Sequence, residues 1–161
     1  MYTVDKKDKV LPLSDVPQSS VGAPCPVVLA NDHTTVVAYY TQEDEIDFES
    51  DIEPIAIITF SFCYSTMFGP PNDEAFNGHP LSSRGLEPYS SFMIEDSSWL
   101  RTLIKMNEAH PYHNLKKFEG YKHFILAFHD STFECIAKDF AVEIVADTFS
   151  NAIGLMKEKL K

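Results

Sequence analysis

Apolar and polar residues alternate along residues 55–68, the stretch IAIITFSFCYSTMF. Four large residues fall on one side of this segment: Ile58, Phe60, Phe62 and Tyr64. A repeat of two is the spacing of a β-strand, because successive side chains point to opposite faces of a sheet. The pattern therefore predicts one long strand with an apolar core face.

Two β-branched runs at residues 27–30 and 35–41 flank a polar turn at residues 31–33. Val, Thr and aromatic residues favour strands, whereas Asn and Asp favour tight turns. The two runs therefore predict a β-hairpin. Further strands are expected at residues 89–95 and 140–145.

Residues 121–137, YKHFILAFHDSTFECIA, predict a second hairpin with its turn within residues 129–132. An even number of loop residues places six side chains on one apolar face: Phe124, Leu126, Phe128, Phe133, Cys135 and Ala137. An odd loop would turn one strand over and mix apolar with polar residues, so burial favours the even register. In that register we expect Phe128 to face Phe133.

The same register makes His129 and Glu134 diagonal neighbours on the second face of the hairpin, within reach of a hydrogen bond. His123 shares that face, but it lies six residues before His129 and is expected to be too distant to join the pair. A His–Glu pair can orient a tautomer, exchange protons as acid and base, or bind a divalent metal. We therefore expect His129 and Glu134 to be the catalytic residues.

Residues 69–88 form a long irregular segment that contains four of the ten prolines and three of the six glycines. Loops of this length in compact domains are usually either functional lids or disordered linkers. Three apolar residues are expected to pin the segment to the body of the protein: Phe76, Leu81 and Leu86. Its candidate ligand-binding residues are His79 and Arg84.

Apolar residues at helical spacing predict a helix over residues 97–109, with Asp96 or Ser97 as its N-cap. A second helix is predicted at the C-terminal end of the chain, capped by Asp147 or Thr148. Lysines follow in its last turn, where they suit the helix dipole.

His110 and His113 follow the first predicted helix and are further candidate ligand-binding residues. They flank Pro111, so they lack the i, i+4 spacing of two zinc ligands on a helix, although a tight turn could bring them to the same pocket. The candidate ligands of a metal site are His110, His113, His129 and Glu134. A divalent metal is therefore an option, but it is not the favoured one.

The predicted elements run as strands, a helix, more strands and a final helix, without a regular βαβ alternation. This order predicts an α+β fold, mainly an antiparallel sheet or partly rolled barrel, with one central and one C-terminal helix packed on it. Residues 1–24 are polar and proline-punctuated, which predicts an extended N-terminal arm. Residues 25–161 are expected to form a single α+β domain.

Thirteen basic and twenty-four acidic residues give the 161-residue chain a net charge of −11. This charge repels phosphate backbones, so nucleic acid is not expected as a partner. No run approaches the ~20 apolar residues that span a bilayer, so no membrane partner is expected either. The three cysteines are widely spaced and show no CxxC pair, which predicts a reducing, cytoplasmic location.

The acidic residues concentrate in residues 43–53, which begin at Glu43, end at Glu53 and contain seven carboxylates in eleven positions. Such runs are usually solvated connections between elements. The alternative interpretation is a docking surface for a basic partner protein.

Two functions are compatible with these features. The favoured hypothesis is a small protein that binds a small molecule in a His/Glu-containing pocket, with acid–base or metal-assisted chemistry. That pocket would lie between the second hairpin, residues 69–88 and the turn at residues 110–113. The alternative is a non-catalytic, acidic interaction or regulatory protein that binds a basic partner.

Overall fold

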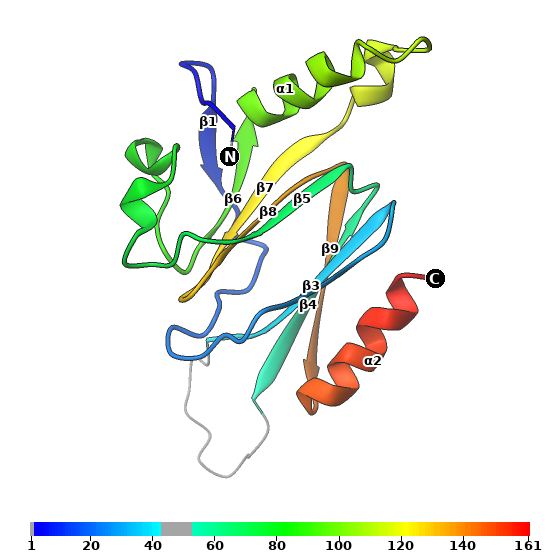
Figure 1. Ribbon diagram of the computed structural model, residues 1–161. Helices are drawn as coiled ribbons and strands as arrows, with labels where there is room; N and C mark the ends of the chain where they lie inside the picture. The colour runs from blue at the N-terminus through cyan, green and yellow to red at the C-terminus, as the bar shows by residue number, and fades with distance from the viewer. Residues whose placement is uncertain (1, 43–52) are drawn as a thin grey trace.

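The computed structural model of the chain describes residues 2–42 and 53–161. These residues form two antiparallel sheets and two α-helices (Figure 1). The strands are β1 (Lys9–Pro12), β2 (Val27–Ala30), β3 (Thr34–Tyr40), β4 (Pro54–Ser61), β5 (Ser65–Gly69), β6 (Ser91–Glu95), β7 (Lys122–Ala127), β8 (Thr132–Ala137) and β9 (Asp139–Ala146). The helices are α1 (Ser98–Asn107) and α2 (Phe149–Lys159).

The five-stranded sheet has the strand order β1-β6-β7-β8-β5, and the four-stranded sheet has the order β2-β3-β4-β9. Neighbouring strands are antiparallel throughout both sheets. The predicted α+β fold, with antiparallel strands, a central helix and a C-terminal helix, is confirmed. Within the described residues the strands form two open sheets and do not close into a barrel.

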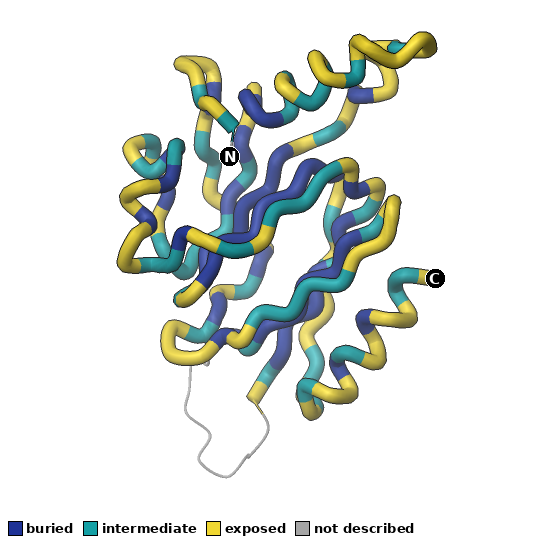
Figure 2. Tube along the Cα trace, in the orientation of Figure 1, coloured by how far each residue is buried: buried dark blue, intermediate teal, exposed yellow. Residues whose placement is uncertain are grey.

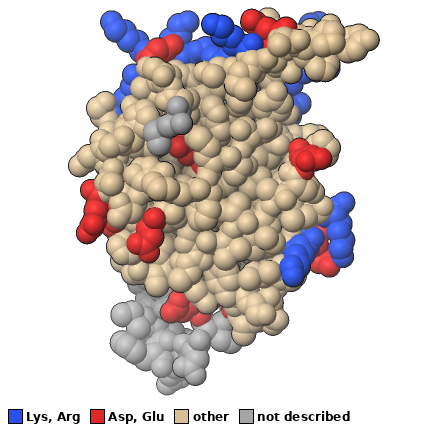
Figure 3. Space-filling view, in the orientation of Figure 1, with Lys and Arg blue, Asp and Glu red and all other residues tan. Residues whose placement is uncertain are grey.

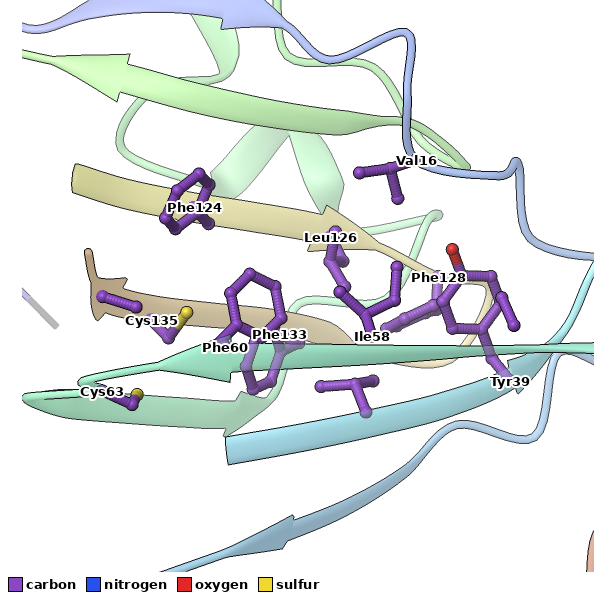
Figure 4. Close-up of a cluster of buried hydrophobic side chains, with 13 residues drawn as sticks. Val16, Tyr39, Ile58, Phe60, Cys63, Phe124, Leu126, Phe128, Phe133 and Cys135 are labelled. Carbon is purple, nitrogen blue, oxygen red and sulfur yellow. The ribbon is translucent and has the colours of Figure 1, made fainter. Parts of the chain in front are cut away.

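The main hydrophobic core lies between the two sheets (Figure 4). The four-stranded sheet contributes Ile58 and Phe60, and the five-stranded sheet contributes Phe124 and Phe133. The ring of Phe60 lies 5.5 Å from that of Phe124 and 5.4 Å from that of Phe133, centroid to centroid. Figure 2 shows that the middle strands are the most buried part of the molecule, as the alternating pattern predicts.

Each sheet also buries part of its outer face. Helix α2 covers the four-stranded sheet, where Ala152 and Met156 belong to the same buried cluster as Ile55 and Ile57. The segment between β5 and β6 covers the five-stranded sheet through the three predicted apolar residues: Phe76, Leu81 and Leu86. This second cover creates the enclosed environment in which polar side chains of β7 and β8 meet.

Both helices begin at a predicted N-cap. The side chain of Ser97 accepts a hydrogen bond from the Leu100 N–H, and that of Thr148 accepts one from the Asn151 N–H. These bonds satisfy N–H groups that have no partner within the first turn of a helix. Neither helix is long and apolar enough to cross a membrane.

The prediction of one long strand over residues 55–68 is wrong. The chain forms β4 and then β5, which belong to different sheets. Phe62 lies between them with a φ of 52°, in the left-handed region that bulky residues rarely adopt. Phe62 and Tyr64 are exposed and do not extend the apolar core face of β4. The alternation in the sequence therefore runs on past the end of β4, which is why it did not reveal the change of sheet.

Strands β7 and β8 form the predicted hairpin, but their pairing is displaced by two residues. Phe133 lies opposite Leu126, not opposite Phe128. Phe128 enters the turn, where its N–H donates to the carbonyl oxygen of Ser131, and its ring still packs against Tyr39. A displacement by two keeps each side chain on its face. The predicted apolar face is therefore confirmed, whereas the predicted pairing is wrong.

The segment predicted as an N-terminal arm contributes to the five-stranded sheet. Its strand β1 pairs with β6 at the edge of that sheet, with Lys9 opposite Glu95 and Pro12 opposite Phe92. Further along, Val16 packs into the core between the sheets. The residues before β1 lie over the outer face of the sheet, where Tyr2 contacts residues of α1 and β7.

Candidate functional site

The outer face of the five-stranded sheet carries a polar cluster, here called the Glu134 cluster, which consists of Tyr2, His79, His123 and Glu134. Glu134 on β8 lies opposite Ile125 on β7. His123 is two residues before Ile125, so it is a diagonal neighbour of Glu134 on the same face. His79 comes from the segment that covers this face, and Tyr2 comes from the residues before β1.

Glu134 accepts three hydrogen bonds inside the protein. The Tyr2 hydroxyl donates to Oε2 at 2.7 Å, and His123 Nε2 donates to the same oxygen at 2.9 Å. His79 Nε2 donates to Oε1 at 3.2 Å. Only 3% of the Glu134 surface is exposed. A buried carboxylate needs such donors, because desolvation of an isolated charge is costly.

No lysine or arginine of the described residues forms an ion pair with Glu134, whose close ionisable contacts are the imidazoles of His79 and His123. Figure 3 shows that the Lys and Arg side chains visible in this view gather at the end of the molecule where β1 and α1 lie, and near α2. The middle of this face is largely uncharged. The N–H and O–H donors of the cluster therefore stabilise the carboxylate.

Backbone and hydroxyl groups determine which ring nitrogens carry protons. The Leu81 N–H donates to His79 Nδ1 at 3.1 Å, so the proton of His79 resides on Nε2 and points to Glu134. The Ser97 hydroxyl lies 2.9 Å from His123 Nδ1 and already accepts an N–H from the first turn of α1. Its own hydrogen therefore points to Nδ1, and His123 also donates through Nε2.

Burial and hydrogen bonding set the pKa values in the Glu134 cluster. Burial raises the pKa of Glu134, but hydrogen bonds from His123 and His79 outweigh it and lower that pKa to about 2. Burial lowers the pKa of His123, against the opposing effect of Glu134. Burial and the charge of Glu134 raise the pKa of Tyr2. At neutral pH the cluster therefore combines a carboxylate, a neutral His123 and a phenol.

A second polar cluster, here called the Asp73 cluster, consists of Asp73, Tyr89 and His129. The Tyr89 hydroxyl donates to Asp73 Oδ2 at 2.5 Å, and His129 Nδ1 lies 3.0 Å from the same oxygen. The Tyr89 hydroxyl and His129 Nδ1 are 3.1 Å apart. The Asp73 N–H also donates to the carbonyl oxygen of His129. One carboxylate oxygen therefore holds a phenol and an imidazole side by side.

The Asp73 cluster is accessible, unlike the Glu134 cluster. The side chain of His129 is 37% exposed. Its hydrogen bond to Asp73 raises the pKa of His129, and the hydrogen bond from Tyr89 lowers the pKa of Asp73. Tyr89 has a φ of 59°. Bulky residues rarely adopt this left-handed conformation, and strain of this kind concentrates at functional sites.

A surface hollow of about 540 Å³ adjoins the Asp73 cluster at Tyr89. Its lining residues lie within residues 12–18 and 85–92, and Glu87 is the only charged side chain among them. This volume falls within the range of small-molecule sites. Tyr89 therefore belongs both to the polar cluster and to the wall of a space that can hold a ligand.

The structure separates the two residues predicted as a catalytic pair. The displaced hairpin register brings Glu134 to His123 and leaves His129 at the turn beside Asp73. The predicted diagonal contact between His129 and Glu134 is therefore wrong. His123, which was expected to be too distant, takes that position.

The two candidates from residues 69–88 lie in different surroundings. His79 is buried in the Glu134 cluster, so the structure brings it together with one of the predicted catalytic residues. Arg84 donates through Nη1 to the carbonyl oxygen of Asp8 at 2.9 Å. Arg84 therefore fastens the covering segment to the residues before β1.

His110 and His113 lie beyond the end of α1, away from both clusters. His113 Nδ1 is 2.9 Å from Asn107 Oδ1, and His110 is exposed. Among residues 2–42 and 53–161, no group of three or more His, Cys, Asp or Glu side chains is placed to hold a metal ion. The metal site considered for His110, His113, His129 and Glu134 is therefore unsupported.

The tautomers of the Glu134 cluster give a physical reason for this result. A histidine that ligates through Nε2 carries its proton on Nδ1, where it normally meets an acceptor. At Nδ1 of His79 the neighbour is the Leu81 N–H, which is a donor. The ring is thus oriented for hydrogen bonding to Glu134 and not for ligation.

Three residues of the clusters had not been singled out from the sequence: Tyr2, Asp73 and Tyr89. Tyr2 belongs to the segment expected to be an arm, and Tyr89 to a predicted strand. The available signal was the long segment of residues 69–88, since Asp73 lies near its start and Tyr89 directly follows its end. Both ends of a covering segment must approach the sheet. Polar residues at these ends can therefore reach the turn of the hairpin and form hydrogen bonds with it.

Comparisons with protein-family models, with curated proteins and with solved structures found no match to this chain. The acidic segment considered as a docking surface for a basic protein lies outside the described residues, apart from the exposed Glu53. The two polar clusters and the hollow beside Tyr89 are therefore the candidate site of this protein.

Proposed function

We propose that the protein binds a small molecule in the hollow beside the Asp73 cluster and transfers a proton to or from it through His129. The observation that carries this proposal is that one oxygen of Asp73 accepts hydrogen bonds from both His129 Nδ1 and the Tyr89 hydroxyl. No hydrogen bond from the rest of the described chain engages His129 Nε2. His129 is thus oriented by one nitrogen and available through the other.

The carboxylate gives His129 two properties of a general acid–base group. It holds the proton on Nδ1, so that Nε2 is the nitrogen that exchanges protons with a ligand. It also raises the pKa of His129 above the ordinary 6.5, which favours the protonated ring that can act as an acid. Asp73 is a positioning residue in this scheme, because it acts through the imidazole.

Tyr89 connects the imidazole to the ligand space. Its ring stacks on that of His129 with an interplanar angle of 24°, and the residue lines the hollow. Its hydroxyl is committed to Asp73. We assign Tyr89 the role of orienting the dyad and forming a wall of the hollow.

The lining of the hollow indicates the class of ligand. It combines apolar residues with serines, and its one charged side chain is the carboxylate of Glu87. An anionic ligand would meet this carboxylate without a lysine or arginine among the lining residues. A neutral or cationic molecule with hydroxyl or amine groups is therefore the favoured class.

Binding can be tested by NMR with a library of neutral and cationic hydroxyl- and amine-bearing fragments. Fragments that bind are expected to shift the ring signals of His129 and Tyr89. The Asp73→Asn substitution should reduce the affinity for these fragments. His33→Gln is the matched control, because His33 is an exposed histidine in the turn between β2 and β3. The proposal would be contradicted if bound fragments did not shift the His129 signals and if His129→Gln bound them with the same affinity as the wild type.

Proton transfer can be tested with the activated ester p-nitrophenyl acetate as a generic probe. We expect the hydrolysis rate to rise with pH as His129 loses its proton, and the midpoint of that rise to move down in Asp73→Asn. His129→Gln should remove this component, whereas His33→Gln should retain it. A pH profile that is the same in the wild type and His129→Gln would overturn the catalytic assignment.

A further inference from the structure

The side chain of Tyr2 fills an aromatic slot in the Glu134 cluster. Its ring stacks on Trp99 with centroids 5.5 Å apart and an interplanar angle of 4°. The ring of His123 meets it edge-on at 5.4 Å, and its hydroxyl donates to Glu134 at 2.7 Å. Tyr2 therefore makes the contacts that a phenol makes in a binding site: two aromatic walls and one charged acceptor.

The walls of this slot are held by groups other than Tyr2. Trp99 lies in the first turn of α1 and contacts the ring of His123 at 5.1 Å. His123 is oriented by Ser97, and Glu134 is held by His79. The acceptor and both walls are thus preorganised, which is what lowers the entropic cost of binding a ligand.

The attachment of Tyr2 to the rest of its own segment is slight. In the described chain, the hydroxyl of Tyr2 makes the only hydrogen bond found for residues 2–4. The anchors that follow are Val4, which packs against the cluster of Phe76, Leu81 and Leu86, and Asp5, whose N–H donates to the Ser98 hydroxyl oxygen and whose carboxylate pairs with Arg101. The buried Asp8 then accepts hydrogen bonds from the Ser98 N–H and hydroxyl. Residues 2 and 3 can therefore leave the slot while Val4, Asp5 and Asp8 hold the start of the chain against the sheet.

We propose that this slot is a binding site for a phenol-bearing ligand, and that Tyr2 occupies it as an intramolecular stand-in. The ligand ring would stack on Trp99 and meet the edge of His123, and its hydroxyl would donate to Glu134. The site is separate from the Asp73 cluster, so the outcome of one proposal does not decide the other. The slot selects a hydroxyaryl group over a plain aromatic ring, because Glu134 requires a donor.

Calorimetry on Tyr2→Ala with phenol and with toluene as probes tests this selection. A hydrogen bond to a charged group corresponds to roughly a tenfold or larger gain in affinity. We therefore expect Tyr2→Ala to bind phenol at least about tenfold more tightly than toluene. The wild type should bind phenol more weakly than Tyr2→Ala, since phenol must displace Tyr2, and Thr3→Ala should behave as the wild type.

Tyr2→Phe provides a second test in which an aromatic ring still fills the slot, so no cavity is created that could destabilise the fold. Its ring retains the stacking on Trp99 but leaves Glu134 without the hydroxyl donor. Phenol should displace this ring more readily than it displaces tyrosine, so its affinity should exceed that for the wild type. The indole N–H signal of Trp99, followed by NMR, reports occupancy of the slot in each variant.

The phenol group could come from a free small molecule or from a tyrosine side chain. Comparing p-cresol with N-acetyl-tyrosinamide distinguishes these sources: tighter binding of p-cresol assigns the slot to small phenols, and tighter binding of the amide assigns it to tyrosine-bearing peptides. Equal affinity for phenol and toluene in folded Tyr2→Ala would overturn the proposal. Failure of phenol to bind Tyr2→Phe more tightly than the wild type would overturn it as well.

Discussion

Glu134 and His123 are joined across the β7–β8 hairpin by a hydrogen bond of 2.9 Å between His123 Nε2 and Glu134 Oε2. The same carboxylate also accepts hydrogen bonds from Tyr2 and His79, which lie 132 and 55 residues away in the sequence. Glu134 therefore ties the residues before β1 and the segment between β5 and β6 to the centre of the five-stranded sheet.

Replacement of Glu134 by alanine is expected to lower the free energy of unfolding by about 3 kcal/mol or more, because each buried donor left unpaired costs about 1–3 kcal/mol. The substitution leaves the donors of Tyr2, His79 and His123 without an acceptor in a dry environment. Urea denaturation followed by tryptophan fluorescence measures the change.

The matched control is Glu119→Ala, since Glu119 is an exposed glutamate. Its effect should stay within about 0.5 kcal/mol, as for ordinary surface substitutions. Similar losses of stability for the two variants would show that Glu134 is not the centre of a stabilising network.

Acid is expected to remove the stabilisation that Glu134 provides. Its pKa is about 2 in the folded protein against an ordinary value of 4.5, so the unfolded chain takes up the proton first. The contribution is therefore complete above pH 4.5 and is lost as the pH falls toward 2. The difference in unfolding free energy between the wild type and Glu134→Gln should shrink over that interval. A difference that stays constant down to the acid limit would contradict the lowered pKa.

His123 adds a loss of stability that begins at higher pH. Burial lowers its pKa from the ordinary 6.5, so the unfolded chain binds a proton that the folded chain excludes. Its contribution is present above pH 6.5 and declines below it. His123→Gln should therefore flatten the pH dependence of stability between pH 6.5 and pH 4.5, as measured by urea denaturation at several pH values. An unchanged slope in that interval would contradict this assignment.

The alternating pattern of the hairpin correctly predicted its faces, but it could not predict its pairing. His123 and Glu134 were both placed on the face opposite Phe124 and Phe133, which the structure confirms. A displacement by two residues preserves every face, so burial alone does not distinguish the two registers. The register is decided by the turn, where Phe128 leaves the ladder yet keeps its ring in the core.

The partners that complete the two clusters come from distant segments with no local periodicity. Tyr2, His79 and Asp73 reach the sheet only because the chain crosses its outer face twice. The apolar residues that pin residues 69–88 were recognisable by type and were confirmed as buried. Which polar residues then meet the hairpin depends on how that segment is threaded, and no repeat in the sequence encodes it.

Replacement of Asp73 by asparagine is expected to lower the pKa of His129. The hydrogen bond and the charge of Asp73 both favour the protonated ring, and the amide supplies no charge. Asp130→Asn is the graded control, because Asp130 raises the pKa of His129 through its charge alone and should produce a smaller decrease. An NMR titration of the His129 ring protons measures both effects. A larger decrease in Asp130→Asn than in Asp73→Asn would contradict the described hydrogen bond.

Ser97→Ala should destabilise the protein more than Thr148→Ala, although both remove an N-cap hydroxyl. The exposed Thr148 accepts one hydrogen bond from the Asn151 N–H, and loss of such a cap costs about 1 kcal/mol. Ser97 is buried, accepts the Leu100 N–H and also contacts His123 Nδ1 at 2.9 Å. Its removal leaves a buried ring nitrogen unpaired, which adds a further cost of about 1–3 kcal/mol.

Urea denaturation of the two cap variants measures this difference directly. The expected order is a loss of about 2–4 kcal/mol for Ser97→Ala and about 1 kcal/mol for Thr148→Ala. Ser97→Thr retains a hydroxyl at the cap and should recover part of the loss, because the oxygen can still accept the N–H of α1 and donate to His123. If the two alanine variants instead lose the same stability, Ser97 acts only as a cap. The orientation of His123 toward Glu134 would then have to depend on the packing of its ring against Tyr2 and Trp99.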